Sequence, residues 1–187
     1  MKKRFWIVAA LAVAAAGGAT TPPPVLEEDF EGTKFPPEGW TVGGFGVWGW
    51  SNPGGYAEGY ARNTPGTWSR CRITTRPFRL DAAARVRAAF RYETIEYGGA
   101  DAHYSIYLTR EGFQYGEALP RTTGWEKYEW LSPLAPYGVD LKIFWDTVVS
   151  HPYNYGTGIF RLDDVVFTAY NIFVAPTSIG RVKALYY

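Results

Sequence analysis

Apolar and polar residues alternate along most of the chain with the two-residue period of β-strands. Val86, Ala88, Phe90 and Tyr92 alternate with arginines, so the apolar side chains fall on one face of a strand. Residues 139–147 repeat the pattern with aliphatic and aromatic residues. Apart from the first residues, no segment keeps a helical period over ten residues, so the alternation predicts an all-β protein.

Glycine and proline interrupt these alternating runs about every ten residues, which is typical of a sandwich or barrel of short strands. We expect strands at about residues 25–31, 39–42, 46–50, 56–62, 69–75, 84–94, 103–109, 125–131, 139–147 and 158–168. The loops are of hairpin length or somewhat longer. The pattern favours a two-sheet antiparallel β-sandwich of jelly-roll type over residues 25–170.

The first 19 residues have the order of a secretory signal peptide. Three cations precede a short apolar run, and small residues follow at a suitable cleavage site. The apolar run is shorter than the ~20 residues that a membrane-spanning helix needs, and a buried N-terminal helix is the alternative. Residues 20–24 form a Pro-rich leader. We expect a secreted or cell-surface protein whose mature chain has no membrane span.

Residues 171–187 form a C-terminal tail beyond the predicted sandwich. The tail carries two cations, no acid and several large apolar residues, so it differs from an ordinary solvated tail. Three roles remain open for it. The tail packs back on the domain, adds a strand to a neighbour's sheet edge, or serves as a secretion or attachment signal.

Charge and cysteine content exclude some classes of partner. The formal net charge is +1, and it falls to −2 without the three cations of the signal peptide. So small a charge does not favour nucleic acid or anionic membranes. Cys71 is the only cysteine, so no internal disulfide can form.

Two groups of acids lie near the two ends of the predicted sandwich. Asp29 and Glu31 are two residues apart and would point to the same side of a strand, and Asp163 and Asp164 are adjacent. If the first and last strands meet, three carboxylates come together, and calcium prefers such oxygen ligands. The alternative is that these acids are solvated or paired with the many arginines.

The aromatic content is high at 18%, and four aromatic residues are candidates for binding a ligand. Trp48 and Trp50 lie among glycines and share one face of a strand, although core packing is an equal alternative. Tyr153 and Tyr155 lie in a loop that we expect to be exposed. Exposed aromatic rings provide flat amphipathic surfaces that suit sugars and protein loops.

Arginines form two stripes of alternating residues. Arg70 and Arg72 share one face of a predicted strand, and Arg85 and Arg87 share one face of another. If the two strands pair, the four side chains form a positive patch that could bind an anionic polysaccharide. A solvated face that blunts a sheet edge is the alternative.

No pattern of catalytic residues stands out. The pair Glu93 and Glu96 is three residues apart, so in a strand its members face opposite sides and cannot flank one sugar. No nucleophile-elbow or H-E-x-x-H motif is present, and neither histidine has a companion at metal-ligand spacing. We therefore expect a protein that is not an enzyme.

Six landmarks occur in an order that resembles the cleaved-adhesin or choice-of-anchor jelly-roll domains of secreted bacterial proteins, which are MAM-like in shape. They are Glu28-Asp29-Phe30-Glu31-Gly32, Phe35-Pro36-Pro37-Glu38-Gly39-Trp40, Trp48-Gly49-Trp50, Ile73-Thr74-Thr75-Arg76-Pro77-Phe78, Gly124-Trp125-Glu126-Lys127 and Leu162-Asp163-Asp164-Val165. The resemblance covers about residues 26–170. It implies an extracellular β-sandwich used in adhesion or ligand binding and often stabilised by calcium.

In this family both acids of the segment matched by Asp29 and Glu31 ligate calcium, and so does an acid of the segment matched by Asp163 and Asp164. The family adds ligands from an acidic loop, but residues 42–46 of this chain contain no acid. Backbone carbonyls or water would have to take their place.

Together these observations predict a secreted, non-catalytic binding or adhesion module for a carbohydrate or protein ligand, with calcium as a possible stabilising ion. A structural subunit of an extracellular assembly, formed by self-association, is the alternative. A glycan-active enzyme is a remote third possibility.

Overall fold

Eleven β-strands make up the part of the chain that the computed structural model describes, residues 23–51 and 55–170. The strands are β1 (Pro24–Glu28), β2 (Thr41–Gly44), β3 (Val47–Ser51), β4 (Tyr56–Asn63), β5 (Thr67–Thr74), β6 (Ala84–Tyr97), β7 (Asp101–Arg110), β8 (Phe113–Leu119), β9 (Glu126–Ala135), β10 (Lys142–His151) and β11 (Gly156–Tyr170). None of the described residues forms a helix that could cross a membrane.

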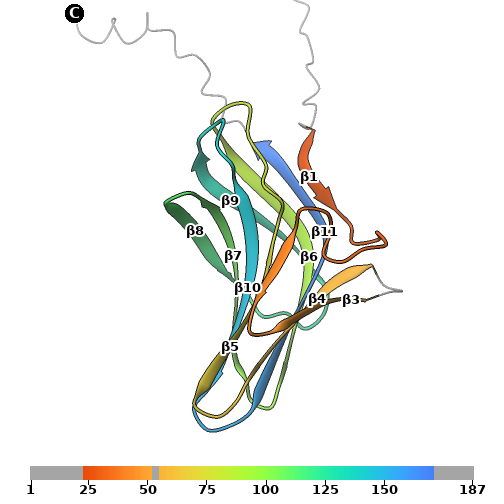
Figure 1. The fold of residues 1–187 in the computed structure, drawn as a ribbon, viewed down its shortest axis with the longest axis vertical. Helices are drawn as coiled ribbons and strands as arrows, with labels where there is room; N and C mark the ends of the chain where they lie inside the picture. Colours follow the sequence, from red (N-terminus) through yellow and green to blue (C-terminus); the bar gives the residue numbers. More distant parts are fainter. Residues whose placement is uncertain (1–22, 52–54, 171–187) are drawn as a thin grey trace, which may run out of the picture.

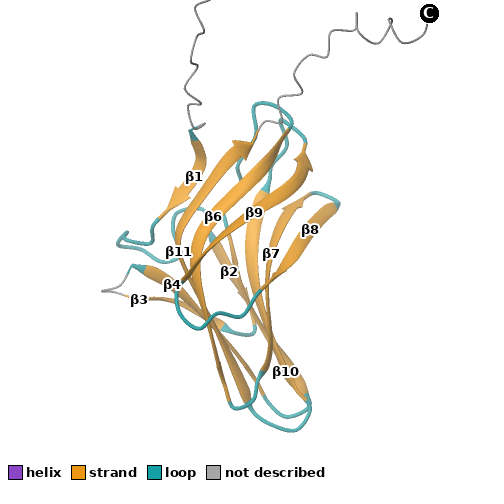
Figure 2. Ribbon diagram, turned by 180° about the vertical axis from the view of Figure 1, so that it is seen from behind, coloured by secondary structure: helices purple, strands orange, loops and turns teal. Residues whose placement is uncertain are grey.

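The strands form two antiparallel sheets that pack face to face (Figures 1 and 2). One sheet, here called sheet A, has the order β3-β4-β11-β6-β9, and β1 pairs with the far end of β11. The other, sheet B, has the order β2-β5-β10-β7-β8. The predicted fold class, an all-β two-sheet sandwich of jelly-roll type, is confirmed.

Side-chain alternation determines which face of each strand is buried. In β6, Val86, Ala88, Phe90 and Tyr92 are all buried, whereas the arginines between them point away from the core. In β10, Trp145 lies at the centre of the core with its indole ring inaccessible to solvent. Burial of these apolar faces is the main source of stability in a sandwich.

Several strands begin or end a few residues away from their predicted bounds, and β8, β10 and β1 are three examples of the differences. Strand β8 (Phe113–Leu119) was not expected, because it lies at the edge of sheet B and buries only its last residue, so its sequence lacks a strong apolar alternation. Strand β10 lies about four residues later than the predicted 139–147. Strand β1 ends at Glu28, and the chain turns at Phe30, whose φ is +53°.

The first and last strands lie side by side, because Pro24 pairs with Thr168 in the β1–β11 ladder. A bulge interrupts β11 between Asp163 and Val166 and places Asp164 in the left-handed region, with φ at +50°. Figure 1 shows that both ends of the described chain lie at the upper end of the sandwich. The predicted signal peptide and the C-terminal tail lie outside the described residues.

Candidate functional site

The outward face of sheet B carries the candidate site, here called the platform. It is formed by the outward side chains of β2, β5, β10, β7 and β8. In β5, Ser69, Cys71 and Ile73 are buried, so Arg70 and Arg72 point outward. Both arginines belong to the predicted ligand-binding set.

A nearly buried carboxylate holds the two arginines together. Asp146 of β10 pairs with Arg72 across the ladder, and its side chain is only 3% exposed. The Nε of Arg70 donates to both carboxylate oxygens at 2.7 Å, and an Nη of Arg72 donates at 3.1 Å. These hydrogen bonds also raise the pKa of Arg70, so the guanidinium remains charged.

An aromatic stack continues from this cluster across the sheet. The guanidinium of Arg72 lies 3.8 Å from the centre of the Phe144 ring, and Tyr107 stacks on Phe144 with centroids 4.7 Å apart. Tyr107 extends over Gly116, where any Cβ atom would collide with the ring. The stack therefore fixes Arg72 from one side while Asp146 fixes it from another.

Two exposed aromatic rings form the lower end of the platform. Trp68 of β5 is 56% exposed and meets Phe45, which is 79% exposed, edge to face at 5.6 Å. Phe45 is held by its neighbour Gly46, whose N–H donates to the carbonyl of Arg70. A hollow of about 400 Å³ adjoins Trp68 and is lined by His151 and Pro152, among others.

A wider hollow of about 710 Å³ lies at the opposite end of the platform. The outward residues Thr109 of β7 and Lys142 of β10 line this hollow. Arg79 and Asp140 also line it and form an ion pair of 2.6 Å. From Ser150, beside Trp68, to Lys142 the platform extends about 26 Å along β10, at about 3.3 Å per residue.

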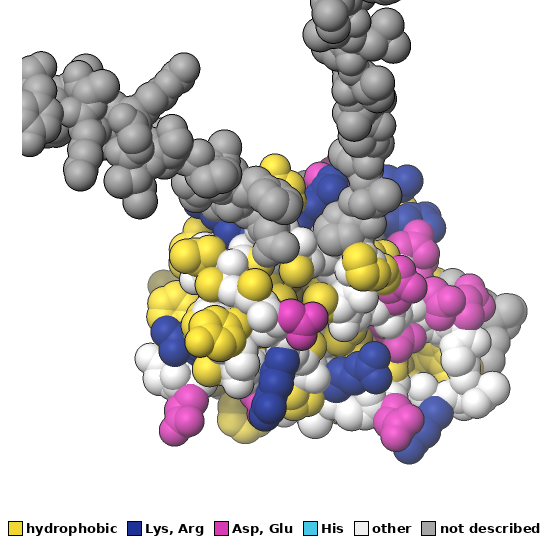
Figure 3. Space-filling model, turned by 90° about the horizontal axis from the view of Figure 1, so that it is seen from above, with side chains coloured by type: hydrophobic (Ala, Val, Ile, Leu, Met, Phe, Trp, Pro, Cys, Tyr) yellow, Lys and Arg dark blue, Asp and Glu magenta, His cyan; other side chains and the backbone are white. Residues whose placement is uncertain are grey.

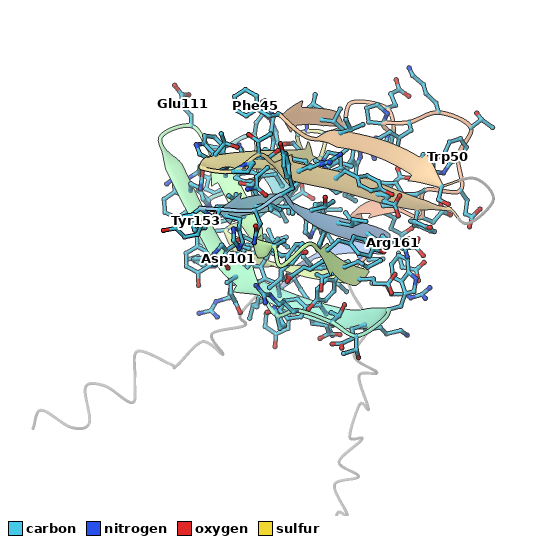
Figure 4. The ribbon with its side chains drawn as sticks, turned by 90° about the horizontal axis from the view of Figure 1, so that it is seen from below. Phe45, Trp50, Asp101, Glu111, Tyr153 and Arg161 are labelled. Carbon is cyan, nitrogen blue, oxygen red and sulfur yellow. The ribbon has the colours of Figure 1, made fainter. Side chains whose placement is uncertain are left out.

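Tyr153 and Tyr155 are exposed, as predicted, in the loop between β10 and β11. His151 Nδ1 accepts hydrogen bonds from the N–H groups of Tyr153 and Asn154, at 3.1 and 2.9 Å. Seen from below in Figure 4, Phe45 and Tyr153 lie toward the left of the view and Trp50 toward the right.

The tertiary structure corrects the expectation that Arg85 and Arg87 share a patch with Arg70 and Arg72. Strand β6 belongs to sheet A and β5 to sheet B, so the two arginine stripes lie on opposite outer faces. Arg87 instead forms an exposed 2.6 Å ion pair with Glu129 of the neighbouring strand β9. The four arginines therefore do not form one patch.

The expectation for the two tryptophans of β3 is also corrected. Trp48 is buried, packs edge to face on Phe160 and covers Gly59, so it belongs to the core. Trp50 is half-buried, and its Nε1 donates to the carbonyl of Phe30 at 2.8 Å. Neither side chain reaches the platform. Trp145 of sheet B, in contrast, is fully buried in the core.

The four acids predicted to bind calcium gather near the end of β1 and the bulge of β11. Figure 3 shows acidic side chains concentrated on one side of the upper end. Asp29 lies in the turn after β1, and not in a strand as expected, and it lines a hollow of about 380 Å³ together with Asp164. Burial raises the pKa of Asp163, and the negative charges of Asp164 and Glu31 add to the effect.

Arg91 of β6 balances part of this negative charge. Its Nη1 lies 3.5 Å from Asp163 and 3.4 Å from Asp164. Across residues 23–51 and 55–170, no three acidic, histidine or cysteine side chains are arranged to hold a metal ion. Calcium binding therefore remains a prediction.

Sequence reasoning missed Asp146, Phe144 and Tyr107 as site residues. The alternation in 139–147 was visible, but Phe144 and Asp146 are nearly buried although they point outward, because the arginines and Tyr107 cover them. The sequence carried one signal for the site. Aromatic and charged residues occupy every second position of β5, namely Trp68, Arg70 and Arg72.

Comparisons with known proteins add information on the fold alone. No known protein family matches the sequence, and no curated protein matches it. Among solved structures, the chain is similar to the family 22 xylan-binding domain of Xyn10C from Paenibacillus barcinonensis. The TM-score is 0.50 at 14% identity, over 81% of this chain and 97% of that one.

Two further carbohydrate-binding modules are among the similar solved structures, with lower TM-scores. A family 61 module, TmCBM61, whose structure was solved with β-1,4-galactotriose, gives a TM-score of 0.48 at 15% identity, over 79% of this chain and 99% of that one. A family 29 module gives a TM-score of 0.48 at 15% identity, over 83% of this chain and 95% of that one. The overall fold is thus shared with the xylan-binding domain at a TM-score of 0.50, whereas the cleaved-adhesin resemblance remains a prediction.

Proposed function

We propose that this protein is a secreted, non-catalytic carbohydrate-binding module that binds an extracellular glycan on the platform. The observation that carries the proposal is the pair of exposed rings, Trp68 and Phe45, in line with the Arg70–Asp146–Arg72 cluster on one sheet face. The expectation of a carbohydrate ligand is thereby retained, and its site moves to the outward face of sheet B.

The residues of the platform suit the chemistry of a sugar. A pyranose ring presents apolar C–H groups on its faces and hydroxyl groups around its edge. Aromatic rings such as Trp68 can pack against the C–H faces, because they combine a large apolar surface with a polarised edge. The guanidinium groups of Arg70 and Arg72 can donate to hydroxyl oxygens. A platform about 26 Å long, at about 3.3 Å per residue, suits an oligosaccharide better than a single sugar.

The shared fold supports this proposal. The similar structure with a TM-score of 0.50 is named as a xylan-binding domain. We carry over from it only the class of ligand, a polysaccharide, and not the identity of the sugar.

The absence of catalysis is part of the proposal. Glu58 and Glu93 are both held by Arg161, at 2.6 and 2.7 Å, on the outward face of sheet A. Carboxylates tied to one guanidinium in this way are poorly suited to act as acid and base on a sugar.

Replacing Trp68 with alanine is expected to weaken glycan binding at least tenfold. Burial and stacking of one aromatic ring are worth about 1.5–3 kcal/mol, and 1.4 kcal/mol corresponds to tenfold. Affinity gel electrophoresis against a panel of polysaccharides, followed by calorimetry on those that bind, measures the effect.

Tyr97→Ala is the matched control, since Tyr97 is 58% exposed on the outward face of sheet A. It should bind as the wild type does. If Tyr97→Ala loses binding while Trp68→Ala keeps it, the site lies on sheet A and the platform is rejected.

We also propose that calcium stabilises the acid cluster near the end of β1. The resemblance implies it, and the accumulated negative charge around Asp163 supports it. A cation that binds only the folded state adds about 2.7 kcal/mol at a hundredfold excess over its Kd. Chelation should therefore lower the melting temperature of the wild type.

The variant Asp163→Asn tests whether ionisation of Asp163 in the acid cluster lowers the stability of the calcium-free protein. Because the pKa of Asp163 is raised in the folded state, its contribution to stability is present below pH 3.8 and is lost as pH rises through the folded pKa. In chelator at pH 7 the variant should therefore melt at a higher temperature than the wild type, and it should no longer respond to calcium. A wild type insensitive to chelator argues against calcium.

A further inference from the structure

We propose that the platform selects acidic glycans, in which the carboxylate of a uronic acid unit is bound by Arg72 together with Arg70. This inference rests on the proposed function and adds the class of sugar.

The charges of the cluster do not balance at the surface. Two guanidinium groups share the single carboxylate of Asp146. Asp146 is 3% exposed, whereas the side chains of Arg70 and Arg72 are 35% and 30% exposed. A ligand approaching the platform therefore meets the two cations and not the anion between them.

The other charged groups of the platform do not cancel this surplus. Lys142 adds a cation farther along β10. At the lower end of β7, the exposed Asp101 lies 3.5 Å from His103 and 3.7 Å from Arg121, so it is already accompanied by basic groups. The outward positions of β8 hold no charged residue, since Gln114, Gly116 and Ala118 pair with the outward row of β7.

Space is open in front of the arginines. Gly43 of β2 lies beside Arg72 in the ladder, and a Cβ atom at Gly43 would meet nothing within 4 Å. The edge strand therefore places no side chain over the guanidinium. A ligand group can reach Arg72 from this side without displacing a neighbour.

Arg72 is fixed before any ligand arrives. Its guanidinium is held against Phe144 at 3.8 Å and bonded to Asp146 at 3.1 Å. A planar guanidinium in a fixed orientation suits a carboxylate, because the two can form parallel hydrogen bonds. Holding the side chain in place also reduces the entropy lost on binding.

The order along β5 matches a chain of sugars with acidic units. Trp68, Arg70 and Arg72 occupy successive outward positions, about 6.6 Å apart. One sugar can stack on Trp68 while the carboxylates of units farther along reach the arginines. A neutral glycan would use Trp68 and leave the cations without an anionic partner.

The central comparison of the test is between each acidic polysaccharide and its own uncharged ester. Wild-type protein is titrated with polygalacturonate and alginate and with their esters, whose carboxyl groups are uncharged. Neutral xylan and galactan and sulfated dextran complete the panel. We expect at least one uronate polymer to bind about tenfold or more tightly than its ester, with the difference falling as salt rises.

Arg72→Gln should bring the ratio of the affinities for the acidic polysaccharide and for its ester close to one. Arg70 keeps its hydrogen bonds to Asp146 in this variant, so the fold should persist, and a melting curve checks it. Arg72→Lys, which keeps the charge without the planar donor pair, should give an intermediate ratio. Arg87→Gln on the outward face of sheet A is the matched control and should keep the wild-type ratio.

The outcomes separate the inference from the proposed function. Equal binding of acid and ester, or binding of neutral glycans alone, overturns the acidic selectivity while the binding module stands. Binding of sulfated dextran without any uronate polymer rejects the carboxylate class. Failure to bind any polysaccharide in the panel overturns the proposed function and the inference with it.

Discussion

Asn63→Ala is expected to lower the free energy of unfolding by about 3 kcal/mol. Asn63 is 1% exposed, and its side-chain amide joins the β4–β5 turn to the β10–β11 loop. Its Nδ2 donates to the carbonyls of Thr64, His151 and Asn154 at 3.1–3.3 Å, and its Oδ1 accepts from the N–H of Gly156 at 2.8 Å.

The expected loss of unfolding free energy follows from the buried polar groups that lose their hydrogen bonds to Asn63. Each hydrogen bond is worth about 1 kcal/mol net, and a buried group left without a partner costs about 1–3 kcal/mol. Alanine would leave the N–H of Gly156 without its partner, and the carbonyl of Asn154 would lose the bond from Asn63. The carbonyls of Thr64 and His151 keep their bonds from the backbone N–H groups of Thr67 and Gly66. The loop that carries Tyr153 and borders the hollow beside Trp68 would also lose its anchor.

Urea unfolding followed by tryptophan fluorescence measures this loss. Asn154→Ala is the matched control, because the side chain of Asn154 is exposed and the carbonyl that accepts from Asn63 belongs to the backbone. The control should stay within about 0.5 kcal/mol of the wild type. A loss below about 1 kcal/mol in Asn63→Ala would contradict the role assigned to this side chain.

Trp145→Ala is expected to lower the free energy of unfolding by about 4 kcal/mol, close to the lower end of the range of about 5–15 kcal/mol by which native proteins are stable. The indole stacks on Trp40 at 6.2 Å and on Phe167 at 6.0 Å, and it meets Phe90 edge to face at 5.5 Å. Removing it leaves a large cavity between the two sheets, and the neighbouring rings can fill only part of it.

Trp68→Ala is the informative companion, because both tryptophans belong to sheet B and point to opposite faces. Replacing the outward Trp68 should leave the unfolding free energy within about 1 kcal/mol of the wild type while it weakens glycan binding at least tenfold. If instead Trp68→Ala destabilises the fold as strongly as Trp145→Ala, the exposed ring serves stability, and its assignment to a ligand fails.

The alternation of residues was enough to find most strands and their buried faces. Val86, Ala88 and Phe90 face the core as expected, because a strand places successive side chains on opposite sides whatever its neighbours are. Strand β8 was missed because the prediction of strands depended on this alternation of apolar and polar residues. At a sheet edge with almost all its side chains exposed, no apolar face has to be buried, and the sequence carries no periodic signal.

The candidate site was found only in part. Arg70 and Arg72 were singled out because they share one face of a strand, and that relation is local. Asp146, which holds them, lies 74 residues beyond Arg72 in the sequence. Its role depends on β10 pairing with β5, and the sequence did not identify that partner.

The sequence by itself determined the all-β class, the alternation of inward and outward residues and the presence of arginine stripes. These properties depend on the geometry of a single strand. The tertiary structure decided that Arg85 and Arg87 lie on sheet A, away from Arg70 and Arg72, and that Trp48 packs inside. Strand order arises from contacts between residues far apart in the chain, so the pattern within one strand does not specify it.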